Sequence, residues 1–217
     1  HKGVNTFTLQ TSGSTGSPKE IVLHKALMQW SAANTASVIH PTKDDRILCC
    51  LPCTKVGGLM MLVRAIEWQI PVEIIEPIAN PFLIERNASI VSLTPFQLFQ
   101  IFNNKESLEH LKKTRIVIIG GGELSDALEQ EIIKNEFEHT VFYHSYGMTE
   151  TYSHIALRAI NGPNASANFK PFDDVKITAT AEGCAQIKLP MHEIELTTTD
   201  IIALNTDGSF KIIGRAD

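Results

Sequence analysis

An uninterrupted apolar segment near the middle of the chain constrains the fold more than any other feature. Arg115-Ile-Val-Ile-Ile119 has no polar residue after its first position, which is typical of a strand buried on both faces of a parallel sheet. The segment ends at Gly120-Gly121-Gly122. A helix is expected next, because Ser125 can cap it and Asp126 and Glu129 suit the positive end of its dipole. Strand, turn and helix together predict an α/β fold with helices covering a largely parallel sheet.

The pattern of strands and helices divides the chain into two parts. Strand-like and helix-like segments alternate up to residue 160, which predicts a layered, largely parallel sheet with helices. After that point the helical pattern ends, and short strand-like segments between turn residues predict a small antiparallel β-subdomain. We therefore expect an α/β core over residues 1–160 and a β-rich subdomain over residues 161–217. The strands are expected at residues 6–10, 20–23, 46–51, 72–75, 89–93, 115–119 and 140–144 of the core and at 175–178, 185–189, 194–197, 201–204 and 210–213 of the subdomain, and the helices at 25–39, 59–68, 96–102 and 126–137.

Bulk composition excludes several classes of protein. With 217 residues and a hydrophobic content of 43%, the chain can bury a substantial core. Its net charge of -5 argues against a general nucleic-acid binder. The sequence shows neither a secretory signal pattern nor an apolar segment of about eighteen residues, so we expect no membrane span and a cytoplasmic location. The oligomeric state stays open, with a homodimer among the alternatives.

The cysteines raise the question of a redox or metal site. Cys50 and Cys53 have the two-residue spacing of such motifs. They end a strand-like segment instead of opening a helix, and cysteine is a common small core residue. We therefore favour a role in the core.

A loop rich in glycine and serine, residues 11–19, follows the first strand-like segment. Its sequence, Thr-Ser-Gly-Ser-Thr-Gly-Ser-Pro-Lys, offers close backbone approach at the glycines, hydroxyl donors, and a cation at Lys19. This chemistry suits phosphate, although a solvated turn has the same composition. Gly13 and Gly16 are too close together for the P-loop of kinases and GTPases, so that class is disfavoured.

The loop resembles the phosphate loop of the adenylate-forming superfamily, which includes acyl- and aryl-CoA ligases, luciferases and peptide-synthetase adenylation domains. Further segments resemble the motifs of that superfamily in the same order. They are Gly120-Gly121-Gly122-Glu123-Leu124, Tyr146-Gly147-Met148-Thr149-Glu150, Thr198-Thr199-Asp200 and Gly214-Arg215-Ala216-Asp217. The resemblance spans Thr11 to Asp217. It implies that a complete member also has α/β structure before this chain and a mobile C-terminal lid domain after it, which carries a lysine used in adenylation.

The resemblance implies ATP, Mg²⁺ and coenzyme A as cofactors and co-substrate, and a small carboxylic acid as substrate. Thr149 is expected to contact the α-phosphate, Glu150 to hold Mg²⁺, and Lys19 to contribute to catalysis at the phosphates. Thr199 stands where the superfamily usually has glycine. The other residues expected to bind the nucleotide are Thr11, Ser12, Gly13, Ser14, Thr15, Gly16, Gly121, Gly122, Glu123, Tyr146, Gly147, Met148, Asp200 and Arg215.

Within the superfamily, two segments are most similar to the o-succinylbenzoate–CoA ligases of menaquinone biosynthesis. They are Pro18-Lys19-Glu20-Ile21 and Thr151-Tyr-Ser-His-Ile-Ala-Leu-Arg158. The resemblance therefore implies activation of o-succinylbenzoate as an acyl-adenylate, followed by thioester formation with coenzyme A. Another aryl- or acyl-CoA ligase would share every ATP motif. A non-catalytic nucleotide-binding fragment is the alternative of a different class, and this chain alone is expected to be weakly active or inactive.

The acid pocket is the least defined part of the predicted site. o-Succinylbenzoate has a second carboxylate, which Lys55, Arg64 or Arg158 could meet. Lys55 precedes Gly57 and Gly58 where the superfamily often has an aromatic–histidine pair, and a lysine suits an acidic substrate. Each of these cations could instead be an ordinary surface or ion-paired charge. His24 and His154 lie beside motifs and are expected to be structural hydrogen-bonding groups.

Overall fold

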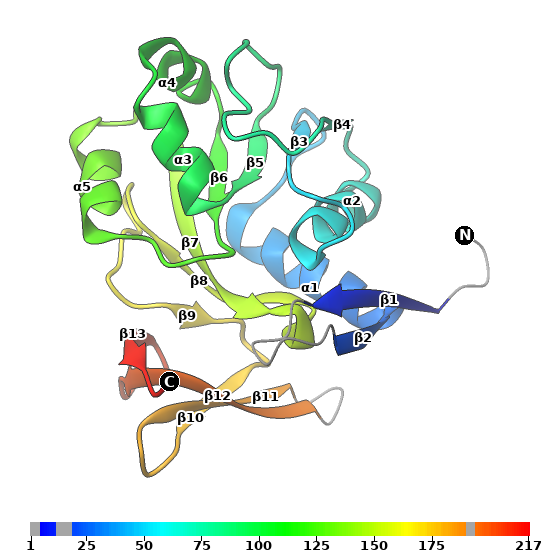
Figure 1. The fold of residues 1–217 in the computed structure, drawn as a ribbon, viewed down its shortest axis with the longest axis vertical. Coiled ribbons are helices and arrows are strands. Elements are labelled where there is room, and N and C mark those ends of the chain that lie inside the picture. The colour runs from blue at the N-terminus through cyan, green and yellow to red at the C-terminus, as the bar shows by residue number, and fades with distance from the viewer. Residues whose placement is uncertain (1–4, 12–18, 190–193) are drawn as a thin grey trace.

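A seven-stranded sheet forms the centre of the molecule (Figure 1). The structure is a computed structural model and describes residues 5–11, 19–189 and 194–217. The sheet contains β3 (Ile47–Cys49), β4 (Val72–Ile74), β5 (Ile90–Leu93), β6 (Ile116–Ile119), β7 (Val141–Met148), β8 (Ser153–Ala159) and β9 (Lys170–Pro171). They lie in the order β4-β3-β5-β6-β7-β8-β9; β4 to β7 pair in parallel, while β8 and β9 are antiparallel to their neighbours. Because the parallel strands all end at one edge, the turns that follow them meet there.

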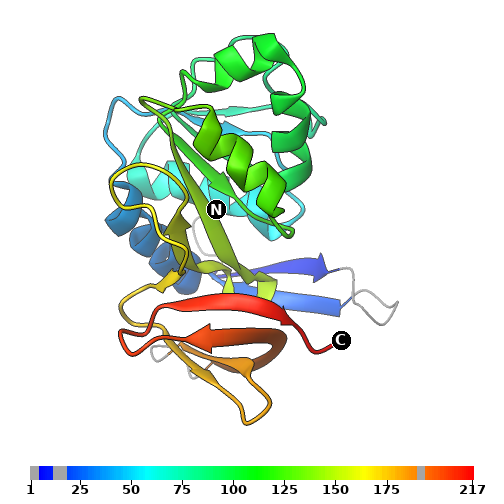
Figure 2. The same cartoon turned by 90° about the vertical axis from the view of Figure 1, so that its left-hand side faces the viewer.

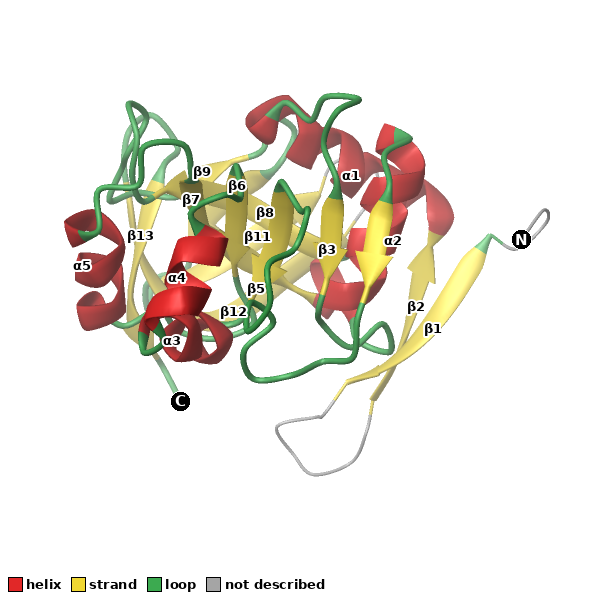
Figure 3. Cartoon of the chain, turned by 90° about the horizontal axis from the view of Figure 1, so that it is seen from above, coloured by secondary structure: helices red, strands yellow, loops and turns green. Residues whose placement is uncertain are grey.

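Helices cover both faces of this sheet (Figures 1 and 3). They are α1 (Lys25–Ile39), α2 (Val56–Trp68), α3 (Pro95–Phe102), α4 (Lys105–Leu111) and α5 (Asp126–Lys134). Strand β6 shows how the sequence produces this layering, since successive side chains of a strand point to opposite faces. Ile116 and Ile118 pack in the core with residues of α1 and α2, whereas Val117 and Ile119 pack with residues of α3, α4 and α5. The apolar strand is buried on both faces, as its composition predicts.

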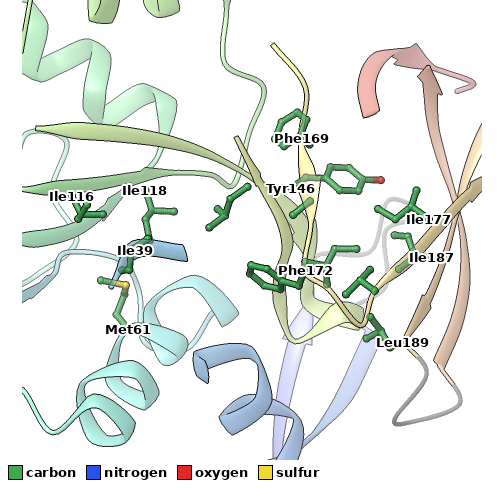
Figure 4. Packing of buried hydrophobic residues seen from close by; sticks show 14 of the residues in the cluster. Ile39, Met61, Ile116, Ile118, Tyr146, Phe169, Phe172, Ile177, Ile187 and Leu189 are labelled. Atoms are coloured by element: carbon green, nitrogen blue, oxygen red, sulfur yellow. The ribbon is translucent and has the colours of Figure 1, made fainter. Parts of the chain in front are cut away.

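A second, four-stranded antiparallel sheet lies at one end of the molecule, below the central sheet in Figure 2. It contains β10 (Lys176–Ala179), β11 (Cys184–Leu189), β12 (Ile194–Leu204) and β13 (Phe210–Arg215). Phe169 and Phe210 join the two sheets through a pair of backbone hydrogen bonds of 2.7 and 3.0 Å. One apolar core runs across this junction from Ile118 through Tyr146 to Ile187 (Figure 4). The two sheets therefore share part of their hydrophobic stabilisation.

An antiparallel hairpin flanks the predicted phosphate loop. Strands β1 (Thr6–Thr11) and β2 (Lys19–His24) pair along their whole length, from Thr6 with His24 to Thr11 with Lys19. Leu9 and Leu23 anchor the hairpin in a small core with α1 and α2. The ends of the loop are thus held together on a packed support.

The structure confirms the predicted fold, an α/β core with a mostly parallel sheet and an antiparallel β-region after it. Three elements were missed: the short helix α4, the two-residue strand β9, and strand β8, whose segment was assigned only by its resemblance to the ligases. The two strands expected at residues 194–197 and 201–204 are one continuous strand, β12. The helix expected at residues 126–137 ends at Lys134, since Asn135 caps it and Glu136 has a positive φ of 46°. The division between residues 160 and 161 stays a prediction; hydrogen bonding changes from one sheet to the other between β9 and β10. Among the described residues, no helix combines the length and hydropathy that a membrane span needs.

Candidate functional site

The glycine-rich motif segment Gly120–Leu124 lies where β6 ends, at the common edge of the parallel strands. Gly121 has a φ of +75°, a conformation that favours glycine. A Cβ at Gly120 would lie 2.4 Å from the Ser145 Oγ of the neighbouring strand, and a Cβ at Gly122 would lie 3.7 Å from the ring of Pro95. The turn therefore packs closely between the ends of β5 and β7, and Glu123 follows it exposed.

Tyr146 connects the end of β7 with the four-stranded sheet. Its hydroxyl donates a hydrogen bond of 2.8 Å to the Asp200 carboxylate on β12, and Figure 4 shows the hydroxyl pointing toward that sheet. Burial raises the pKa of Tyr146 well above its ordinary value, so the phenol stays a proton donor. The ring packs against Phe169 and Phe210, with centroids 6.0 and 5.3 Å away. Two motifs that are 54 residues apart are therefore in direct contact.

The segment after Tyr146 forms a tight turn that presents Thr149 and Glu150. At Gly147 a Cβ would lie 2.2 Å from the Ser153 carbonyl oxygen, so only glycine fits between β7 and β8. A single 3-10 turn, Thr149–Thr151, follows, and the Met148 backbone N–H donates to the Thr151 hydroxyl at 2.9 Å. Both Thr149 and Glu150 are half-buried at this turn, where they remain accessible to a ligand.

Arg215 pairs with Asp200 across β12 and β13 and is exposed. Its guanidinium donates to the Thr199 hydroxyl at 2.9 Å and forms an ion pair with Asp217 at 2.8 Å. Thr199, the departure from the usual glycine, thus has a structural use, because its hydroxyl holds Arg215 beside Asp200.

The structure describes the two ends of the phosphate loop, at Thr11 and Lys19. Ser12, Gly13, Ser14, Thr15 and Gly16 lie outside the described residues, as do the side chains of Thr11 and Lys19. The end of β1 lies beside the start of α2, where the Lys55 ammonium donates to the Gln10 carbonyl oxygen at 3.1 Å. Lys55 thus lies one residue from the start of the loop.

Gly57 and Gly58 lie in the first turn of α2, which begins at Val56, and Gly58 is needed for close packing. A Cβ there would lie 2.4 Å from the Pro52 carbonyl oxygen, while a Cβ at Gly57 would meet a leucine side chain at 3.3 Å. The start of α2 is therefore pressed onto the turn that follows β3.

Arg64, two turns further along α2, is a buried cation held by polar but uncharged groups. It is 2% exposed, and its Nη2 donates to the Ser153 Oγ at 2.9 Å and lies 3.5 Å from the ring nitrogens of His154. His154 is hydrogen-bonded at 2.9 Å to the Thr35 hydroxyl, which itself donates to a backbone carbonyl. The Thr35 hydroxyl already donates its proton to this carbonyl, so it accepts from His154. His154 Nε2 therefore carries the imidazole proton, and Nδ1 can accept a hydrogen bond from Arg64.

Electrostatics keep this cluster singly charged. Burial lowers the pKa of His154 well below its ordinary value, with the Arg64 charge as a second cause, so the imidazole is neutral. Burial also lowers the pKa of Arg64 to about 10, which leaves the guanidinium charged at neutral pH. Its Nε has no hydrogen-bond partner within the described part of the chain. The site therefore holds a buried positive charge without a neutralising carboxylate among the described residues.

Arg158, the third predicted substrate cation, is ion-paired. It lies on β8, and both of its terminal nitrogens donate to the Glu129 carboxylate on α5, one of them at 2.8 Å. Its Cζ also lies 5.4 Å from the centroid of the Phe169 ring. Sequence reasoning did not identify Glu129 as its partner, nor Ser153 and Thr35 as supports of the Arg64 cluster. No spacing signal could have found them, because each contact joins distant elements.

Comparison with known proteins identifies the family. The sequence model of the AMP-binding enzyme family, described as "AMP-binding enzyme", matches residues 6–184. The chain belongs to this family. Among curated relatives, a 2-succinylbenzoate–CoA ligase of Oceanobacillus iheyensis is 28% identical, and the match covers 69% of this chain and 32% of the relative. A 2-succinylbenzoate–CoA ligase of Listeria monocytogenes is 31% identical, and that match covers 68% of this chain and 32% of the relative. The chain thus spans about a third of the length of these AMP-binding relatives.

Solved structures show the same fold. An AMP-forming acyl-CoA synthetase/AMP-acid ligase II-like protein of Dyadobacter fermentans superposes with a TM-score of 0.87 at 35% identity, over 99% of this chain and 61% of that one. The o-succinylbenzoate coenzyme A synthetase of Bacillus subtilis, solved with ATP and magnesium ion, has a TM-score of 0.77 at 22% identity, over 96% and 49%. The predicted resemblance to the adenylate-forming superfamily, and within it to the o-succinylbenzoate–CoA ligases, is confirmed.

Proposed function

We propose that this AMP-binding chain is the nucleotide- and acid-binding core of an AMP-forming acid–CoA ligase. The observation that carries the proposal is the contact between Tyr146 and Asp200, which brings the motif segments of two sheets together beside the Thr149–Glu150 turn. Such a ligase first lets a substrate carboxylate oxygen attack the α-phosphorus of ATP, which releases pyrophosphate and leaves an acyl-adenylate. The thiol of coenzyme A then attacks the acyl carbon, its proton is lost, and AMP leaves.

This chain contributes chiefly orientation and charge neutralisation to that chemistry. The left-handed backbone at Gly121 and the tight turn after Gly147 would bring backbone groups to the nucleotide, and Thr149 would donate to the α-phosphate. Asp200, oriented by the Tyr146 hydroxyl, and Arg215 would hold the ribose. Lys19 and the loop before it would hold the β- and γ-phosphates.

The residues present fit a magnesium ion bound together with the nucleotide. Mg²⁺ commonly binds one or two protein carboxylates plus phosphate oxygens and water, and Glu150 supplies one half-buried carboxylate at the turn. Within the described residues no group of three or more His, Cys, Asp or Glu side chains forms a metal site. The proposed ion would therefore be bound together with the nucleotide. The bound ion would neutralise charge on the phosphates during displacement.

We further propose o-succinylbenzoate as the acid, in menaquinone biosynthesis and in the cytoplasm. Support comes from the named relatives and from Arg64, whose buried charge suits the second carboxylate. Coenzyme A is then the co-substrate, and a homodimer is compatible with the described fold. Pyrophosphate release by the complete protein, measured with o-succinylbenzoate and with other aryl and acyl acids, separates this substrate from those of other ligases.

Replacement of Glu150 tests the reaction class. In the complete protein, Glu150→Gln should lower acid-dependent pyrophosphate release by about 100-fold or more, because the metal loses its charged ligand. Glu131→Gln, at a half-exposed side chain on α5, is the matched control and should leave the rate unchanged. A near-normal rate for Glu150→Gln would refute the metal assignment. Binding of ATP without acid-dependent pyrophosphate release in the complete wild-type protein would favour the non-catalytic alternative.

A further inference from the structure

The end of β3 places two cysteine side chains side by side, and they are not the pair suggested by sequence spacing. Cys49 packs in the core shared with α1 and α2, whereas Cys50 faces the opposite core and its thiol donates to the Ser92 carbonyl oxygen at 3.5 Å. The sulfur of Cys49 lies 3.9 Å from that of Cys53. Strand alternation therefore separates Cys50 from Cys53 and brings Cys49 to Cys53 instead.

The two neighbouring thiols differ in access. Cys49 is fully buried, whereas Cys53 is half-buried in the turn before α2. Burial raises the pKa of the Cys49 thiol to about 11, so it reacts poorly with a reagent from solvent. A reagent would therefore meet Cys53 first, with Cys49 placed directly behind it.

We propose that Cys49 and Cys53 form a reversible disulfide when the protein meets a small-molecule disulfide such as oxidised glutathione, and that this bond displaces the turn before α2. In the first step the Cys53 thiolate attacks one sulfur of the oxidant and releases one glutathione thiolate. Cys49, after losing its proton to solvent, then attacks the Cys53 sulfur and releases the second glutathione. Two protein thiols are oxidised and one glutathione disulfide is reduced to two thiols, so electrons and atoms balance.

The displacement follows from the close packing around this turn. A disulfide bond is about 2.05 Å long, so the two sulfurs must approach by roughly 2 Å. The Cys49 thiol now donates to the Gly58 carbonyl oxygen at 3.6 Å, and the Lys55 backbone N–H donates to Pro52 at 3.0 Å. Movement of Cys53 therefore strains the first turn of α2 and the segment that carries Lys55.

Peptide mass mapping tests the bond itself. The folded protein is incubated with oxidised glutathione, and its remaining thiols are then alkylated with N-ethylmaleimide in denaturant. The experiment uses the Cys50→Ala variant, because it leaves Cys49 and Cys53 as the only cysteines close together in the sequence. We expect a peptide lighter by two hydrogen atoms, without glutathione, and with Cys184 alkylated. Dithiothreitol should restore both thiols.

Two further variants distinguish the partners. Cys53→Ser should form no disulfide, and Cys49→Ala should retain one glutathione on Cys53. A Cys50→Ala protein that keeps both thiols free, or that keeps glutathione on Cys53, would overturn the proposal; so would a bond in wild type that Cys50→Ala abolishes. The Cys50→Ala protein tests the proposal even if the Cys49→Ala protein fails to fold.

Hydrogen exchange tests the displacement without any measurement of ligase activity. The Lys55 amide is expected to exchange several-fold faster in the oxidised than in the reduced protein, because its hydrogen bond to Pro52 is weakened. Amides of β6, away from the turn, serve as the internal control. Equal exchange at Lys55 in both forms would contradict the displacement.

Discussion

Arg64 and Arg158 carry the same charge in opposite surroundings. Arg158 forms a two-pronged ion pair with Glu129, and its neighbour His144 is neutral, because burial lowers the pKa of that histidine to about 4. Arg64 is more deeply buried, and within the described part of the chain its partners are a hydroxyl, a sulfur and a neutral imidazole. A buried charge without a counter-charge is costly. From this difference we infer that Arg158 stabilises the fold, and we propose that Arg64 binds an anion such as the second carboxylate of the acid.

Replacement of Arg64 should have the largest effect on this comparison. In the complete protein, Arg64→Met should raise the KM for the acid by about 100-fold, since one partner of a desolvated ion pair is lost. The melting temperature should stay unchanged or rise, because methionine fills the space without a desolvation cost. Enzyme kinetics and thermal unfolding of the same sample measure both quantities.

Arg46→Met is the control for Arg64, since Arg46 is exposed next to β3. It should change neither quantity. A lower melting temperature for Arg64→Met with an unchanged KM would show that Arg64, like Arg158, has only a structural role.

Loss of Glu129 should have the next largest effect, and on stability alone. Glu129→Gln removes the counter-charge of Arg158, whose side chain is 10% exposed, so the free energy of unfolding should fall by about 2 kcal/mol. The KM for the acid should stay within about twofold, as expected for an ion pair with a structural role alone. Urea unfolding checks the first value. An unchanged free energy of unfolding would contradict the structural role given to Arg158.

The fold was predictable from the sequence where local pattern and burial agree. The surroundings of the arginines were not predictable. The strand β6 and the start of α5 follow from apolar composition and capping residues. The seven-residue helix α4 was missed because so short a helix shows little periodicity. Motif order led to Tyr146 and Asp200, but it did not show that they touch. Whether an arginine is paired depends on packing between distant elements, as the separation of Arg158 and Glu129 by 29 residues illustrates.

Acid should remove the difference between wild type and Glu129→Gln. The hydrogen bond from Arg158 lowers the pKa of Glu129 below its ordinary value of 4.5. The folded protein therefore binds fewer protons than the unfolded chain, and the stabilisation is complete above pH 4.5 and lost as the pH falls through the lowered value. Urea unfolding at a series of pH values should show the two free energies converging on acidification. A difference that persists unchanged in acid would mean that the pair does not titrate as a unit.

Lys55 should give the smallest effect, and salt should separate it from Arg64. Its ammonium is exposed and donates to the Gln10 carbonyl oxygen, so Lys55→Ala should raise the KM for the acid by only about threefold. An exposed charge is screened by ions, whereas a buried one is screened much less. The KM ratio of Lys55→Ala to wild type should therefore approach one in high salt, while the ratio for Arg64→Met stays large. If both ratios fell together, Arg64 would act from a solvated position, and the contrast between a buried receptor for the acid and an exposed steering charge would not hold.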